Sequence, residues 1–144
     1  MLSVNDKNTH FLILERGEKF IATITAYCVN NKLKGAFFKA IGALENVELG
    51  YYDLHNKNYI RKTFDESDYE LVSAHGNLTV KAGESYVHIH ASLSGADFQV
   101  FGGHLFEAEV AVTAEVQITI FDVQSIRQPD QKIGLDLVCQ FHKS

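Results

Sequence analysis

The chain has 144 residues, of which 46% are hydrophobic and 22% are charged, and its formal net charge is −5. This length suits one domain, and the composition is typical of a globular protein rather than a disordered one. The sequence contains no apolar run of the roughly 20 residues that a membrane helix needs, and its start does not resemble a secretory signal. We therefore expect residues 1–144 to form a single domain, without a membrane partner.

The two cysteines, Cys28 and Cys139, are too few and too far apart for a disulfide framework or a Cys-rich zinc site. Both lie in periodic apolar segments, so we expect them to fill space in the core. A reducing cytoplasm is the expected compartment.

The first part of the chain predicts one strand followed by one helix. Residues 10–15 form a short apolar run that is typical of a strand, and Arg16 and Gly17 interrupt it. Between residues 18 and 33 the apolar side chains recur near helical spacing, which predicts an amphipathic helix that ends before Gly35.

The remainder of the chain predicts mainly strands. Strand-like runs occur at residues 36–42, 47–54, 59–64, 69–80, 85–93, 110–121 and 133–141. Gly76 lies inside one of these runs and indicates a β-bulge. Because only one helix is expected, few crossovers are available. The prediction is an α+β fold, with a mostly antiparallel β-sheet flanked by one main α-helix.

Three histidines form the main candidate site. In the strand predicted at residues 85–93, side chains alternate between faces. Tyr86, His88 and His90 therefore share one side, and Val87 and Ile89 lie on the opposite side, which we expect to face the core. His104 follows two adjacent glycines, which would let a tight loop direct its imidazole at the pair. Three neutral imidazoles with an open position are typical of a catalytic-type zinc site, and other first-row divalent metals would also fit. The alternative is that these histidines are ordinary polar residues on a strand surface and in a loop.

Glu115 is the candidate catalytic residue beside this metal site. It lies in the strand predicted at residues 110–121, on the face opposite the apolar side chains. If this strand neighbours the histidine strand, Glu115 could orient a ligand imidazole or transfer a proton. The alternative is an exposed strand carboxylate. Arg16 has two similar interpretations, as an anion-binding group near a helix N-terminus or as a surface arginine.

The charge pattern bears on nucleic-acid binding. The densest basic stretch contains Lys57, Arg61 and Lys62, and acidic residues follow it directly. Nucleic-acid-binding proteins usually display a basic stripe, so the acidic net charge disfavours DNA as a partner. Binding to DNA would require assembly to repeat this basic stretch around an oligomer.

Several segments, in this order, resemble the plants-and-prokaryotes conserved domain over nearly the whole chain. They are ERGE (15–18), GAFFKAIGALENVELGYYD (35–53), ELVSAHGNLT (70–79), VHIHASLS (87–94), GGHL (102–105) and TAEV (113–116). The resemblance implies a compact α+β fold assembled as a homotrimer. The fold group is also similar to acetolactate decarboxylase, whose zinc is held by an HxH…H arrangement. This points to His88, His90 and His104 as metal ligands.

The resemblance implies a metal site but does not identify a reaction. We expect a trimeric protein that binds Zn²⁺ or another first-row divalent metal, with a small-molecule ligand, as an enzyme or as a binding protein. The decarboxylase reaction itself is not carried over. A DNA-binding or regulatory protein is the alternative, because prokaryotic members of the family are often described as DNA-binding by analogy with the plant members, some of which join the domain to an AT-hook. This chain has no Arg-Gly-Arg-Pro segment of that kind. A purely structural trimer is the third hypothesis.

Overall fold

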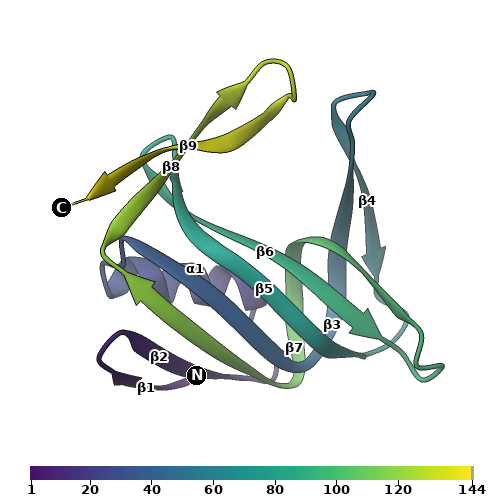
Figure 1. Cartoon of the computed structure of the whole chain (residues 1–144). Helices are drawn as coiled ribbons and strands as arrows, with labels where there is room; N and C mark the ends of the chain where they lie inside the picture. The colour runs from purple at the N-terminus through teal and green to yellow at the C-terminus, as the bar shows by residue number, and fades with distance from the viewer. Residues whose placement is uncertain (144) are drawn as a thin grey trace.

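The computed structural model describes residues 1–143, and within them nine strands form a sheet with a single helix packed against one side of it (Figure 1). The elements are β1 (Leu2–Asp6), β2 (Thr9–Glu15), α1 (Phe20–Asn30), β3 (Gly35–Asp53), β4 (Asn58–Phe64), β5 (Tyr69–Lys81), β6 (Glu84–Ser94), β7 (Val100–Phe121), β8 (Val123–Asp130) and β9 (Leu135–Lys143). The expected mostly antiparallel sheet with one main helix is confirmed; only the β5–β8 pair is parallel among the strand pairs of this part of the chain. No helix in the described residues combines the length and apolar character that a membrane crossing requires.

The four central strands, β3, β5, β6 and β7, pair with one another in a closed circuit. Strand β3 pairs with both β5 and β7, and β6 pairs with the same two strands from the other side. The four strands therefore form a ring of hydrogen bonds with an inner and an outer surface. The β1–β2 hairpin extends this sheet at β7, and the β8–β9 hairpin extends it at β5.

The sequence predicted two short strands where the structure has the single long strand β3. The strand changes its partner midway, from β5 to β4, and its pairing with β7 is irregular between Glu45 and Glu48. Asn46 has a φ of +51°, a conformation that asparagine adopts more readily than most residues. Its side-chain amide donates to Glu109 at 2.9 Å. The segment between the two predicted strands, residues 43–46, thus forms a bend within one strand.

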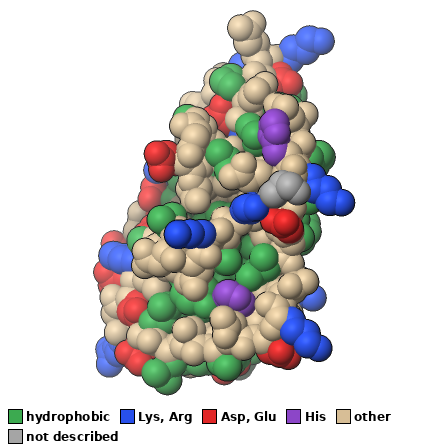
Figure 2. Space-filling model, turned by 90° about the vertical axis from the view of Figure 1, so that its left-hand side faces the viewer, with side chains coloured by type: hydrophobic (Ala, Val, Ile, Leu, Met, Phe, Trp, Pro, Cys, Tyr) green, Lys and Arg blue, Asp and Glu red, His purple; other side chains and the backbone are tan. Residues whose placement is uncertain are grey.

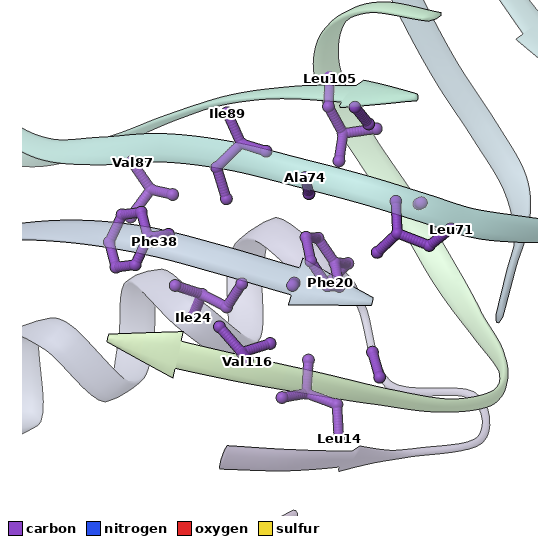
Figure 3. Packing of buried hydrophobic residues seen from close by; sticks show 14 of the residues in the cluster. Leu14, Phe20, Ile24, Phe38, Leu71, Ala74, Val87, Ile89, Leu105 and Val116 are labelled. Atoms are coloured by element: carbon purple, nitrogen blue, oxygen red, sulfur yellow. The ribbon is translucent and has the colours of Figure 1, made fainter. Parts of the chain in front are cut away.

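The core lies on the inner surface of the ring, where helix α1 packs against β6 and β7. In Figure 3, Phe20 and Ile24 of the helix point toward Phe38 of β3 and Val116 of β7, and all four side chains are buried. The helix is shorter than the predicted span of residues 18–33. Burial of apolar side chains on one face holds it in place, since an isolated helix of 11 residues is marginal in water.

A carboxylate from β7 caps the start of this helix. Glu107 accepts hydrogen bonds from the backbone N–H groups of Ile21 and Ala22, at 2.8 and 3.1 Å. These N–H groups have no partner inside the helix, and the helix dipole favours a negative charge there. The sequence offered Arg16 as an anion-binding residue near the N-terminus of this helix, or as a surface arginine. In the structure Arg16 is exposed.

Two details of the sequence-based prediction are wrong. Gly76 pairs regularly with Phe38 and Ile89, whereas the irregularity in the β5–β6 pairing lies between Leu71 and Ser73. Gly76 is needed for a different reason, because a Cβ there would overlap the backbone carbonyl oxygen of the neighbouring strand β6. Cys28 is buried as expected, but Cys139 is exposed on the terminal hairpin.

Two hairpins rise from the upper end of the sheet in Figure 1, and residues of both line the candidate site described below. One is β3–β4 and the other is β8–β9. Tyr52 Oη donates to the carbonyl oxygen of Ile133 at 2.7 Å, and Lys57 Nζ donates to that of Gln131 at 2.9 Å. These two bonds hold the tip of the β8–β9 hairpin against the β3–β4 hairpin.

Candidate metal centre

His88, His90 and His104 converge on one point of the outer surface. Each offers a ring nitrogen, and these three atoms all lie within 4.8 Å of one another. The ring centroids are 5.1 to 5.5 Å apart. One metal ion bound to all three nitrogens would sit about 2.0–2.1 Å from each, so small side-chain adjustments suffice to form a three-histidine site.

Strand alternation and register bring the three rings together. In β6, Val87, Ile89 and Ala91 are buried, so the two histidines between them face outward. The third histidine comes from β7, where His104 lies directly opposite His90. A direct cross-strand pair places side chains on the same face about 5 Å apart.

The position of His104 differs from the sequence-based expectation, since it lies within strand β7 and not in a glycine-hinged loop. The two glycines before it have another role. A Cβ on Gly102 would overlap the carbonyl oxygen of Ala91 in β6, and one on Gly103 would lie 2.8 Å from that of Gly50 in β3. The absence of side chains therefore lets β7 pass between two close backbones, which sets the register of His104.

The surroundings keep the imidazoles neutral. Burial lowers the pKa of His88 to about 4, and the charge of Arg127 and the other two histidines act in the same direction. Burial also lowers the pKa of His104 to about 4, assisted by nearby positive groups. The pKa of His90 is lowered by burial as well. Metal ligation requires the neutral ring, so this environment prepares all three side chains as ligands at neutral pH.

The polar atoms of the site also fit a bound metal. His104 Nδ1 is buried and has no hydrogen-bond partner among the described residues. Leaving such an atom unsatisfied costs roughly 1–3 kcal/mol, which a metal ion or a bound ligand would recover. Asn77 Oδ1, on the residue that pairs with His88, is unsatisfied in the same way. The three imidazole nitrogens are donors that suit a borderline divalent ion such as Zn²⁺.

The histidines line a cavity of about 520 Å³ beneath the two hairpins. Its walls combine rings and charges, namely Tyr52, Tyr59, Arg61, Lys81, Tyr86, Phe106, Arg127 and Asp136, with Gly134, Leu135 and Leu137 of the β8–β9 hairpin. This volume is within the range of small-molecule sites. Burial raises the pKa of Tyr59, so its phenol stays protonated at neutral pH and can donate a hydrogen bond.

Arg127 joins the cavity wall to the histidine cluster. Its terminal nitrogen Nη2 lies 3.0 Å from Nδ1 of His88. A guanidinium group only donates, so Nδ1 of His88 is the acceptor and the proton of this neutral, metal-free ring is on Nε2. This hydrogen bond must break when either nitrogen of His88 binds a metal ion, and the N–H donor of Arg127 then becomes free for another acceptor. Arg127 reaches this position because β8 pairs in parallel with the end of β5, with Arg127 opposite Lys81.

The structure does not bring Glu115 into this cluster. Glu115 pairs with Ile41 of β3, and the strands β3 and β5 separate it from β6. The segment of β7 that borders β6 is Val100 to His104, at the other end of the same strand. Glu115 instead lines a separate surface hollow together with His75 and Gln117. The premise that its strand segment neighbours the histidine strand is therefore wrong.

Sequence reasoning missed most of the cavity wall. It placed Tyr86 on the histidine face, and strand alternation was the signal for this. It considered Arg61 only as part of a basic stretch, whereas Arg61 lies over the Phe106 ring at 3.5 Å and lines the cavity. Arg127 carried no signal in the sequence, because only the pairing of β8 with β5 brings it near His88.

Solved structures with the same fold cover almost the whole chain. A plant- and prokaryote-conserved protein from Pyrococcus horikoshii is 31% identical, with a TM-score of 0.84, over 96% of this chain and 95% of its own. A metal-containing protein from Archaeoglobus fulgidus is also 31% identical, with a TM-score of 0.85, over 93% and 94% of the two chains. A Bacteroides thetaiotaomicron protein, provisionally described as DNA-binding, has a TM-score of 0.90 over 94% of each chain at 20% identity, which shows the fold alone.

The expected similarity to acetolactate decarboxylase is confirmed at the level of the fold. The Bacillus subtilis enzyme matches with a TM-score of 0.53 and 18% identity, over 84% of this chain and 56% of its own. No curated protein is detectably similar to this chain in sequence.

The family model of the Plants and Prokaryotes Conserved (PCC) domain matches residues 1–122, which span β1 to β7 and include all three histidines. The match ends before the β8–β9 hairpin that contributes Arg127. The chain therefore belongs to the Plants and Prokaryotes Conserved domain family.

Proposed function

We propose that this protein binds one divalent metal ion, Zn²⁺ first among the candidates, through His88, His90 and His104, and binds or transforms a small molecule in the adjoining cavity. The observation that carries the proposal is the convergence of the three ring nitrogens within 4.8 Å. Three protein ligands leave a position open, which is the arrangement of catalytic zinc sites. When bound, the ion would supply Lewis-acid polarisation of an oxygen of the ligand.

Two further observations support this proposal. Metal ligation needs neutral rings, and the lowered pKa values of His88 and His104 keep these rings neutral at neutral pH. Nδ1 of His104 has no hydrogen-bond partner among the described residues, so no protein group competes for it. A relative that is 31% identical is described as metal-containing. The protein itself contributes the cavity, the hydrogen-bond donor of Tyr59 and the charge of Arg127.

Metal analysis tests the proposal directly. The full chain is purified without chelator, stripped with EDTA and reloaded with Zn²⁺, and its metal content is measured by mass spectrometry. We expect about one equivalent per chain in the wild type. The double variant His88→Ala/His90→Ala should retain almost none. His55→Ala, an exposed histidine in the β3–β4 turn, is the matched control and should retain the wild-type content. A wild type that takes up no metal would refute the proposal.

We also propose that the protein is a homotrimer. Exposed apolar side chains gather on the outer surface of β2, β7, β3 and β5, namely Phe11, Phe37, Ile41, Val72 and Val112. An exposed apolar surface of this kind is typical of a subunit contact. Light scattering should give three times the chain mass of 16.1 kDa. Ile41→Asp should shift it to the single-chain mass, whereas Phe98→Asp, at an exposed position outside this surface, should not. A wild-type mass near that of one chain would contradict the trimer.

The structure favours metal binding over DNA binding as the function to test first. Arg61 pairs with Glu48 at 3.1 Å, and Lys57 donates to the carbonyl oxygen of Gln131, so both are engaged within the protein. On the face shown in Figure 2, basic and acidic side chains are interspersed and form no continuous basic stripe. A gel shift at low salt tests this alternative, because nonspecific binding would be strongest there.

A further inference from the structure

Arg127 carries a positive charge that no carboxylate of the described residues neutralises. Its three hydrogen bonds, each 3.0 Å long, reach Thr79 Oγ1, the backbone carbonyl oxygen of Asp136 and Nδ1 of His88. All three acceptors are neutral. Because a half-buried charge is normally paired, Arg127 needs an explanation.

The other cations of the cavity wall differ from Arg127 in this respect. Lys81 Nζ pairs with a carboxylate oxygen of Asp136 at 2.7 Å, and Arg61 pairs with Glu48 at 3.1 Å. Both charges are therefore balanced inside the protein. Within the described residues, Arg127 is the cation of this cavity whose charge is left for a ligand.

Arg127 also has donors to spare. A guanidinium group has five N–H donors in a fixed planar fork, and the three hydrogen bonds leave two of them unused. The group lines the cavity, so an incoming anion can reach it. The planar fork matches a carboxylate particularly well, since two parallel N–H···O bonds can form.

Aromatic rings surround this donor group and the histidines. The guanidinium carbon of Arg127 is 5.3 Å from the centroid of the Tyr86 ring. The ring of Tyr59 lies 5.2 Å from that of His104 and 5.1 Å from that of Tyr52. Aromatic walls of this kind favour a flat apolar molecule, because rings pack edge-to-face or offset against one another.

We propose that Arg127 is the anion-binding residue of this cavity and that the ligand is a small organic carboxylate with a flat apolar body. The carboxylate binds the guanidinium group, and the body lies between the aromatic rings beside the histidine cluster. Arg127 is beyond residues 1–122, so the β8–β9 hairpin, outside the matched family domain, determines this specificity. This inference adds a ligand class to the proposed function. It rests on the proposed function for the metal ion that lies next to the ligand.

The metal and the carboxylate should strengthen each other's binding. A divalent ion on the three histidines adds positive charge next to Arg127, whose guanidinium nitrogen is already 3.0 Å from His88. An anion between the two cations reduces their repulsion. The coupling is reciprocal, so Zn²⁺ should tighten carboxylate binding by the same factor as the carboxylate tightens Zn²⁺ binding.

Chemical-shift titration of the full-length protein tests the inference. Benzoate is the probe, and acetate, benzyl alcohol and inorganic phosphate are compared with it, in EDTA-treated and in Zn²⁺-loaded protein. We expect benzoate to bind most tightly. Arg127→Gln should weaken it at least about tenfold, since a charge-assisted bond is lost. Arg127→Lys should fall in between, and the exposed Arg16→Gln is the matched control, without effect.

Each outcome decides the inference. Unchanged benzoate binding in a folded Arg127→Gln protein would overturn it, as would benzyl alcohol or phosphate binding as tightly as benzoate. If the glutamine variant does not fold, the lysine variant decides by the same comparison. Arg127-dependent benzoate binding in a protein that takes up no Zn²⁺ would refute the proposed metal function and leave this inference standing. Metal uptake without any carboxylate binding would refute this inference and leave the proposed metal function standing.

Discussion

Replacing Gly76 by alanine should disturb both the fold and the histidine site. Gly76 lies in β5, opposite Ile89 of β6. A Cβ at this position would overlap the carbonyl oxygen of His88, and it would lie 2.6 Å from Cγ1 of Ile89, where ordinary contact begins at 3.4 Å. The obstacle includes backbone, so no side-chain rotation relieves it. The β5–β6 pair must separate, and His88 moves with it.

The expected loss lies at the upper end for an overpacked core, about 3 kcal/mol of unfolding free energy. For a chain of this length this corresponds to a decrease of roughly 10 °C in the melting temperature. Zn²⁺ affinity should fall as well, because displacement of His88 misaligns one of the three ligands. Calorimetry of the EDTA-treated protein measures the first effect, and a Zn²⁺ titration measures the second.

Gly95→Ala is the matched control. Its added Cβ would meet only the Tyr69 ring at 3.8 Å and a carboxylate oxygen of Asp97 at 3.9 Å, both ordinary contacts. We expect its melting temperature and Zn²⁺ affinity to remain close to wild type. If Gly76→Ala behaved like this control, the close approach of β5 and β6 inferred from the structure would be incorrect.

Three other properties can be tested with the metal-free protein. Glu107→Ala should cost about 1 kcal/mol in a denaturant titration, because two N–H groups of the first turn of α1 lose their acceptor; unchanged stability would contradict the cap. Burial lowers the pKa of His88 and His104 to about 4, so their contribution to stability is complete above their unfolded pKa of about 6.5 and is lost as the pH falls toward 4. Denaturation midpoints at pH 7.5 and 5 should show this decrease, and a double variant with glutamine at both positions should reduce it; a higher midpoint for the wild type at pH 5 would count against it. A thiol reagent should modify the exposed Cys139 quickly and Cys28 only on unfolding, since burial raises the pKa of the Cys28 thiol to about 12; equal rates would place Cys28 at the surface.

Much of the site followed from local sequence. Period-two alternation placed Val87 and Ile89 in the core and therefore His88 and His90 on the outside. This works because alternation is a property of the extended backbone, independent of which strand lies alongside. The same rule placed Tyr86 on the histidine face, where it lines the cavity.

Pairing between distant strands could not be predicted in the same way. Glu115 and His104 belong to one strand, β7, yet its two ends border different neighbours, so the carboxylate lies far along the sheet from β6. The glycines before His104 suggested a loop, because the sequence does not show that two other backbones lie close to them. Register and strand neighbours depend on the closure of the whole sheet.

The sequence by itself determined the class of fold, the family and the three candidate ligands, because these depend on composition, motif order and strand alternation. Only the tertiary structure decided that the ligands share one point and that Arg127 faces them. Arg127 is 23 residues beyond His104 in the chain and reaches His88 through the parallel pairing of β8 with β5. A contact made in this way depends on how separate segments pack together, which no local pattern encodes.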